Sequence, residues 1–506
     1  MGFINKRIKL VKLMKRLRYF RKIILFVLLF LLPFNTRHIF NYESIKSFEF
    51  FRENITFFMC PFDIGMLLIL STLIWEKPKK ILSKFSQNVS LYASFFVLVL
   101  ILLISSFFAH NQTIAFYNTI RAIEVIIFFF IAKEILSKNT RTFLQGAYAV
   151  FIAGIAQSLI ALFQFIFQKS VGLFVLGESH IAPSILGVAK IEHAGEKLIR
   201  GYGTFSHPNI LGAFLLLALI CGVFLLIFNG EKSLFEKTKD TGLFFFIKKE
   251  LRALKLENFS IWTSHIVIGL LLIVSGIFVT FSRNAWLGLV IVLIFTTSKW
   301  IIINRHLFPV FNQVFYGKNI PKEKVEISPD QKLLLRDTLF LGSLYVVLLL
   351  IFLSPFIADR ICIKNCETAS DAYQLRKDYL NTATKVIRDN PIWGVGPGNF
   401  VVKFDDYSHK KLQEWEKQPV HSIYFLTTSE IGIVGLIALI YFVIQNINYI
   451  IFKHSFGVLL ATFFFMGIFD HFFTSTFQGQ LIFWLCLAFF ASSCKIGNRN
   501  QKFDNF

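Results

Sequence analysis

Apolar runs long enough to cross a membrane recur along the whole chain, and this feature most constrains the fold. Of the 506 residues, 55% are hydrophobic, and Phe supplies 63 of them, a composition that soluble domains rarely have. We therefore expect an all-α polytopic membrane protein with about twelve transmembrane helices, because a spanning helix needs about 20 apolar residues. The expected spans lie near residues 23–40, 58–76, 89–109, 113–136, 143–168, 207–228, 260–281, 284–303, 338–358, 422–444, 455–472 and 479–494.

The positive charge lies in the polar stretches between these runs. The net charge is +22, but no zinc-finger spacing or soluble basic domain accompanies it, so we expect no nucleic-acid partner. Lys and Arg are more numerous in alternate loops, which fits the positive-inside rule if both termini are cytoplasmic. The expected domains are a basic cytoplasmic tail (1–22), transmembrane helices 1–9 (23–358), a large extracytoplasmic loop (359–421), transmembrane helices 10–12 (422–494) and a cytoplasmic tail (495–506).

Three further stretches bear on this layout. The first apolar run resembles a signal peptide, but Pro33 and Arg37 follow it where a small-residue cleavage site would stand, so we expect an uncleaved first span. Segment 242–256 mixes Phe and Leu with Lys and Arg, which fits a helix lying on anionic headgroups. Cys362 and Cys366 share the long loop in a C-x3-C spacing that allows a disulfide or two free thiols. No metal-ligand cluster is visible, and we expect no cofactor.

Two arginines stand beside tight polar turns that this topology places on the outer side. Arg283 lies in VTFSRNAWLG between two apolar runs. It could snorkel to the headgroups, or its planar fork could hold phosphate oxygens bidentately. Arg200 precedes GYGTFSHPN, in which His207 and Asn209 open the next helix. A helix start offers free N–H groups to an anion, although an arginine in a loop with a Ser206 cap is a sufficient structural explanation.

The stretch from Leu375 to Gly435 gathers further polar groups in the expected outer loop. Arg376 and Tyr379 lie one turn apart on an amphipathic helix, whose basic face could simply be solvated. The turn GVGPGN contains Gly396 and Gly398, and glycines there permit positive φ and close backbone approach. His421 begins the next apolar helix. A histidine can take a proton from an attacking hydroxyl near neutral pH, or it can be a cap.

Two more polar pairs lie in or beside apolar runs. Asp470 and His471 end a span on the expected outer side, where they could bind substrate or cap the helix. Arg121 and Glu124 lie at i and i+3 on one helix face. Charged residues within a span usually have a role, but pairing with each other is a sufficient one.

The order of these motifs resembles a known family. RGYGTFSHPN, TFSRNAW, NPIWGVGPGNF, VHSIYFLTTSEIGIVGL and FDHFFTSTFQGQLIFW follow one another as in the O-antigen ligase-like superfamily, which includes O-antigen ligases, O-antigen polymerases and some protein O-glycosyltransferases. The resemblance covers about residues 60–495. It implies a glycosyltransferase C-like helical bundle in the cytoplasmic membrane, with a large outer loop between late helices.

The resemblance also implies an activity. Members of this family move a glycan from an undecaprenyl-diphosphate carrier to a hydroxyl acceptor on a lipid core, a protein or a growing glycan, without a metal at the transfer step. Carried over by motif, Arg200 and Arg283 would bind the diphosphate and His421 would be the base. Arg376 is a looser match. We expect these groups to converge on one extracytoplasmic cavity, with Tyr379, Gly396, Gly398, His207, Asn209, Asp470 and His471 binding substrate.

Other functions remain open at this point. Ligase and polymerase differ only in the acceptor, which these residues do not separate. A lipid or glycan flippase would suit many helices and a charged pair within a span. Transporters, however, often show related halves with broken helices near the midplane, and no repeat is visible here. A non-catalytic assembly partner is a third class, and the Arg and His set argues mildly against it.

Overall fold

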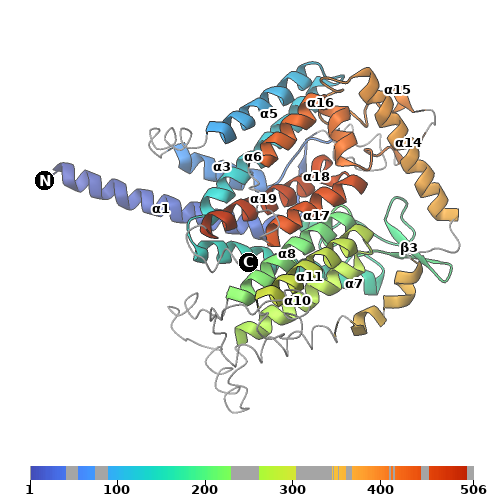
Figure 1. Cartoon of the computed structure of the whole chain (residues 1–506), viewed down its shortest axis with the longest axis horizontal. Coiled ribbons are helices and arrows are strands. Elements are labelled where there is room, and N and C mark those ends of the chain that lie inside the picture. The colour runs from blue at the N-terminus through green and yellow to red at the C-terminus, as the bar shows by residue number, and fades with distance from the viewer. Residues whose placement is uncertain are drawn as a thin grey trace, which may run out of the picture.

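The fold is described from a computed structural model. It describes residues 2–40, 55–74, 89–228, 261–303, 345, 347–351, 353–359, 367–408, 412–413, 416–445 and 455–497. Figure 1 shows the apolar helices side by side in one bundle, with α1 (Gly2–Leu31) projecting from one end. The interfacial helix expected at 242–256, and Cys362 with Cys366, lie outside the described residues.

The structure is that of a helical membrane protein, as expected from the sequence. Five helices are long and apolar enough to cross a membrane, and five shorter helices are apolar. The long ones are α6 (Gln112–Leu136), α7 (Thr140–Phe167), α8 (Pro208–Phe228), α16 (Ile423–Ile444) and α19 (Phe477–Gly497). The shorter ones are α3 (Pro61–Ile74), α5 (Val89–Phe107), α10 (Ile261–Val279), α11 (Arg283–Ile303) and α17 (Ser455–Phe469). The number twelve stays a prediction, since 338–358 is only partly described, with helix at 347–351 and 353–359.

The first expected span differs from the structure. Helix α1 begins within the basic tail and ends at Leu31, whereas the apolar run predicted a helix over 23–40. Pro33 stands two residues after the helix end and cannot donate a backbone hydrogen bond. The chain then becomes extended, and β1 (His38–Ile39) pairs antiparallel with β2 (Phe58–Met59).

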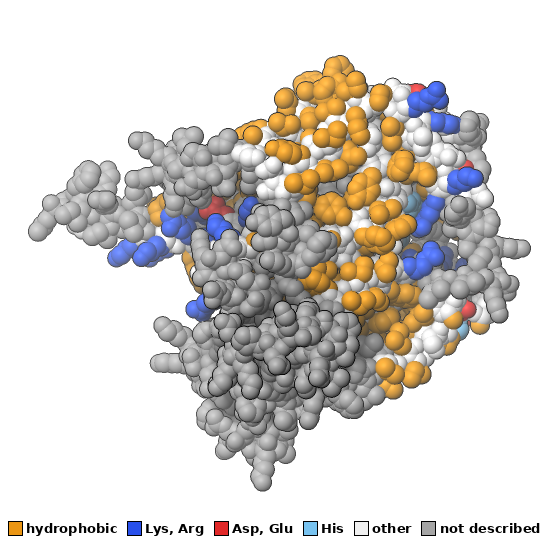
Figure 2. All heavy atoms as spheres, viewed as in Figure 1, with side chains coloured by type: hydrophobic (Ala, Val, Ile, Leu, Met, Phe, Trp, Pro, Cys, Tyr) orange, Lys and Arg blue, Asp and Glu red, His pale blue; other side chains and the backbone are white. Residues whose placement is uncertain are grey.

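Close packing of small residues holds the central helices together. A side chain on Gly154 would meet Ala218 on α8 at 2.4 Å, and one on Gly212 would meet Ala285 on α11 at 2.6 Å. Small residues let helix backbones approach in this way inside a bilayer. Figure 2 shows a band of hydrophobic side chains across the bundle, with Lys and Arg beyond both of its edges. That pattern fits a belt of lipid around the bundle.

The irregular segments gather at the end of the bundle opposite to the start of α1 (Figure 1). We call this the loop end. It carries α14 (Glu367–Asp389), the short α15 (Phe404–Tyr407), the 3-10 turn η2 (Phe174–Leu176) and the antiparallel hairpin of β3 (Lys190–His193) and β4 (Glu196–Ile199). The small helix α18 (Phe472–Ser475) joins α17 to α19. A separate apolar cluster, which includes Tyr379, Phe400, Phe404 and Leu426, holds α14 against the start of α16.

Candidate functional site

A chain of hydrogen bonds joins three helices at the loop end through Arg200. The Arg200 side chain is buried, and its Nε donates to the Thr280 carbonyl at 2.6 Å. One terminal nitrogen donates to Asn209 Oδ1 at 2.7 Å, and Asn209 Nδ2 donates to Asp470 Oδ2 at 2.6 Å. The end of α10, the start of α8 and the end of α17 are thereby tied to one guanidinium.

Two histidines and a tyrosine make ring contacts beside this chain. The ring of His421 stands perpendicular to that of His471, with centroids 5.0 Å apart. The His421 ring also stacks on Tyr379, with centroids 5.6 Å apart and planes within 6° of parallel. Tyr379 is held in turn, because its hydroxyl donates to the Glu416 carbonyl. His471 Nδ1 lies 2.6 Å from Ser475 Oγ, so both imidazoles have fixed orientations.

Burial keeps the histidines neutral. Burial, followed by the Arg200 charge, lowers the pKa of His207 to about 3, with smaller effects from His421 and His471. Burial lowers the pKa of His421 well below its ordinary value, and His471 and Arg376 lower it further. Burial likewise lowers the pKa of His471, against the opposite effect of Asp470. The Nδ1 atom of His421 is buried and has no hydrogen-bond partner among the described residues. A neutral ring with an unused ring nitrogen can accept a proton.

Two further arginines lie next to this group and face solvent. Arg283 begins α11, and Arg376 stands on α14; both side chains are exposed. Partial burial lowers the pKa of Arg376; the Asp470 charge opposes that effect and the Arg283 charge adds to it. These charges are therefore close neighbours. Arg200, Arg283 and Arg376 bring positive charge to the Asp470 carboxylate, and the carboxylates of Asp378 and Glu416 lie near Tyr379. The two exposed arginines can attract an anionic ligand.

We call these residues the loop-end site. It brings together nine of the residues singled out from the sequence: Arg200, His207, Asn209, Arg283, Arg376, Tyr379, His421, Asp470 and His471. Sequence reasoning missed Ser475, whose i+4 spacing from His471 was an available signal. It also missed the Thr280 carbonyl, because a backbone acceptor has no signature in the sequence.

The glycine-rich turn packs against α16. Gly396 has φ +101°, and a side chain there would meet Ala109 at 2.2 Å. Its N–H donates to the Glu430 carbonyl at 2.8 Å, and the N–H of Gly398 bonds to the Glu430 carboxylate. These N–H groups are used within the protein, so close packing accounts for Gly396 and a positive φ of +74° accounts for Gly398. Substrate contact by Gly396 and Gly398 stays a prediction.

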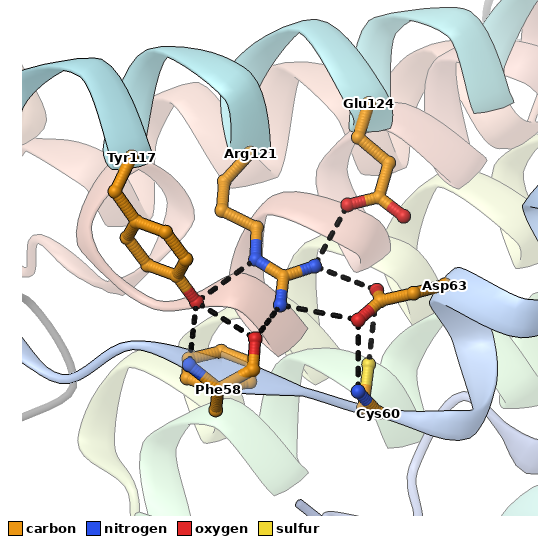
Figure 3. Close-up of polar contacts among 6 residues, drawn as sticks. All are labelled: Phe58, Cys60, Asp63, Tyr117, Arg121 and Glu124. Carbon is orange, nitrogen blue, oxygen red and sulfur yellow. Dashed lines mark hydrogen bonds and ion pairs between the residues drawn. The ribbon is translucent and has the colours of Figure 1, made fainter. Parts of the chain in front are cut away.

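Arg121 lies in a different kind of cluster, drawn in Figure 3. Its Nε donates to Tyr117 at 3.1 Å, and Nη1 donates to Asp63 at 2.6 Å and Glu124 at 2.8 Å. Its Nη2 donates to Asp63 at 3.2 Å and to the Phe58 carbonyl. A guanidinium has five N–H groups, and these contacts use all five. The expected pairing with Glu124 is present, and Asp63 is a second partner that the sequence did not indicate.

These observations define the class of the protein as a polytopic helical membrane protein with a cationic, histidine-containing site at one end. Comparison with family models is more specific: residues 268–440 match the family described as O-antigen ligase, which confirms the resemblance to the O-antigen ligase-like superfamily. The matched segment contains Arg283, Arg376 and His421, while Arg200 and Asp470 lie outside it and join the site through the fold. A comparison with curated proteins found no match.

Proposed function

We propose that this protein transfers a glycan from an undecaprenyl-diphosphate carrier to an acceptor hydroxyl at the outer face of the cytoplasmic membrane. The family match supports a membrane enzyme that ligates or polymerises glycans. The observation that carries the finer proposal is the meeting of exposed cationic Arg283 and Arg376 with a neutral His421. That combination suits a reaction in which a diphosphate leaves and a hydroxyl loses its proton.

The proposed reaction breaks the bond between the anomeric carbon and the diphosphate oxygen. The bond electrons leave with the diphosphate, and the acceptor oxygen forms the new glycosidic bond on the opposite face, so that the anomeric centre inverts. Arg283 and Arg376 stabilise the charge that develops on the leaving group. Arg200 is held by Thr280 and Asn209, and its positive charge also stabilises the leaving diphosphate.

His421 is the proposed base. Its imidazole takes the proton of the acceptor hydroxyl as the new bond forms. A bound diphosphate places negative charge near His421 and offsets the arginine charge, which raises the histidine's proton affinity when the donor is present. Ring contacts with Tyr379 and with His471 orient the His421 ring. Asp470 and Asn209 orient Arg200.

In vitro transfer tests this proposal. Purified protein is incubated with a carrier-linked oligosaccharide and with lipid-core, protein or second carrier-linked acceptors, and free carrier diphosphate and elongated product are measured. We expect His421→Ala to lower kcat by about 10²–10⁴-fold. The matched control is His180→Ala, an exposed loop histidine that stacks on Phe174, which should leave transfer unchanged.

The acceptor that is elongated distinguishes the activities. Transfer to a lipid core or a protein defines a ligase, and transfer to a second carrier-linked unit defines a polymerase. Full turnover by the His421→Ala variant would remove this residue as the base. Movement of the carrier lipid across vesicles without any glycan transfer would replace the proposal with a flippase.

A further inference from the structure

Two glutamines on α7 and a third at its C-cap bind the backbone of the segment that carries Arg200. Gln157 and Gln164 are spaced i and i+7, which places them on one face of α7, and Gln168 follows the last residue of α7 as its C-cap. Gln157 and Gln164 are completely buried. Two long polar side chains inside an apolar bundle need full hydrogen bonding to be tolerated, and the loop from Ile199 to Thr204 provides it.

Gln164 makes the densest contacts. Its Oε1 accepts from the N–H groups of Tyr202 and Gly203, at 2.9 and 2.8 Å. Its Nε2 donates to the Gly203 carbonyl and to Glu178 Oε1, both at 2.8 Å. A carboxamide has two donors and two acceptor lone pairs, and all are used. Glu178 itself accepts from the backbone N–H groups of Val171, Gly172 and Leu173.

Gln157 and Gln168 bind the two ends of the same segment. Gln157 Oε1 accepts from the Thr204 N–H at 2.8 Å, and its Nε2 donates to Thr204 Oγ1 at 2.9 Å. Gln168 Oε1 accepts from the Ile199 N–H at 2.7 Å. Gly203 has φ +59°, and a side chain there would meet Gln157 Oε1 at 2.3 Å. The second glycine of GYG is thus required by the approach of this helix.

Arg200 follows Ile199 directly, and His207 comes three residues after Thr204. Any shift of the held segment moves both side chains relative to His421. We propose that Gln157, Gln164 and Gln168 form a glutamine ladder that positions Arg200 and His207 for catalysis. These are positioning residues, and this role rests on the proposed function.

The first test is amide hydrogen exchange of the peptide covering residues 199–206, which does not depend on any activity. Gln164→Ala removes the partners of the Tyr202 and Gly203 N–H groups, so exchange there should accelerate at least about tenfold through local opening. The control is Gln145→Ala, on the same helix, whose Oε1 has no partner among the described residues. It should leave exchange at 199–206 unchanged. Equal exchange in Gln164→Ala and wild type would overturn the ladder.

The second test is transfer per folded molecule. A small displacement of catalytic groups can reduce turnover by about 100-fold, and we expect kcat to fall by about that factor in Gln164→Ala, with a changed donor KM. The Gln164→Glu variant keeps both acceptor contacts but places a second carboxylate against Glu178. The double variant, Gln164→Glu with Glu178→Gln, restores a donor and an acceptor between these two positions. That pair should recover part of kcat over Gln164→Glu alone.

The outcomes separate the two proposals. A loss of transfer that follows the folded fraction, with kcat and KM per folded molecule unchanged, would mean that the ladder is structural and would overturn the positioning role. A wild-type protein that moves no glycan from any carrier would defeat the proposed function and with it the catalytic part of this inference. Local exchange in Gln164→Ala would still report whether the ladder holds the segment.

Discussion

The protein holds arginines in two opposite ways. The Arg121 cluster is closed, because all five N–H groups of the guanidinium are bonded to Asp63, Glu124, Tyr117 and the Phe58 carbonyl (Figure 3). The loop-end site is open, because Arg283 and Arg376 are exposed and stand near each other. In the closed cluster the Arg121 guanidinium has no N–H group left to bind a ligand, so we expect this cluster to contribute to stability. The open site contains Asp470, but its exposed arginines can still bind an anion.

The largest expected effect comes from opening the closed cluster. Arg121→Ala leaves the Asp63 and Glu124 carboxylates buried without their cation. Removing one partner of a buried pair typically costs about 3–5 kcal/mol. We expect that decrease in the free energy of unfolding, measured by thermal or denaturant unfolding in detergent.

A triple variant that replaces Arg121 and both of its carboxylate partners tests the same prediction from the opposite direction. The combination Arg121→Met, Asp63→Leu and Glu124→Gln should recover much of the lost stability, since apolar replacement of buried ions is often neutral. If Arg121→Ala unfolds like the wild type but abolishes transfer, the division between a stabilising cluster and a ligand site would be wrong.

The open site should respond in activity and hardly in stability. Arg283→Ala should lower kcat by about 10²–10³-fold, as loss of one group that stabilises developing charge does, with stability within about 0.5 kcal/mol of the wild type. Arg283→Lys should recover only part, because an ammonium lacks the planar fork. The measurement is the transfer assay together with unfolding.

The matched control is Arg388→Ala, an exposed arginine in the last turn of α14. Both variants lose one positive charge at the loop end. Similar losses in the two would mean that overall positive charge attracts the donor, and that Arg283 has no particular place in the site.

The two regions also differ in how far they could be predicted from the sequence. The apolar runs predicted the apolar helices that the structure describes, and the expected topology placed Arg283, Arg376 and His421 on one side, which stays a prediction for the membrane itself. Asp63 could not be paired with Arg121 in advance, because that contact depends on how α3 and α6 are rotated. Gln164 gave no signal either, since a glutamine in an apolar helix looks the same in the sequence whether it faces solvent or a buried loop.

A smaller effect tests how the proposed base is held. Tyr379→Phe keeps the ring that stacks on His421 but removes the hydrogen bond to the Glu416 carbonyl. We expect a loss of about 0.5–1.5 kcal/mol in stability, with most of the transfer activity retained. Tyr379→Leu removes the aromatic face as well, and it should lower kcat further at a similar folded fraction. Equal transfer by both variants would show that stacking does not orient the histidine.

The smallest expected effect is a pH dependence of stability that originates in the open site. His207 has a folded pKa of about 3, below the ordinary value of about 6.5. Between these values the unfolded chain binds a proton that the folded protein does not, so the free energy of unfolding falls as pH drops below about 6.5. From pH 7 to pH 6 this amounts to about 0.7 kcal/mol for one histidine. His207→Gln should remove that part of the slope in unfolding measured across this range, and an unchanged slope would mean that the pKa of His207 is the same in the folded and unfolded protein.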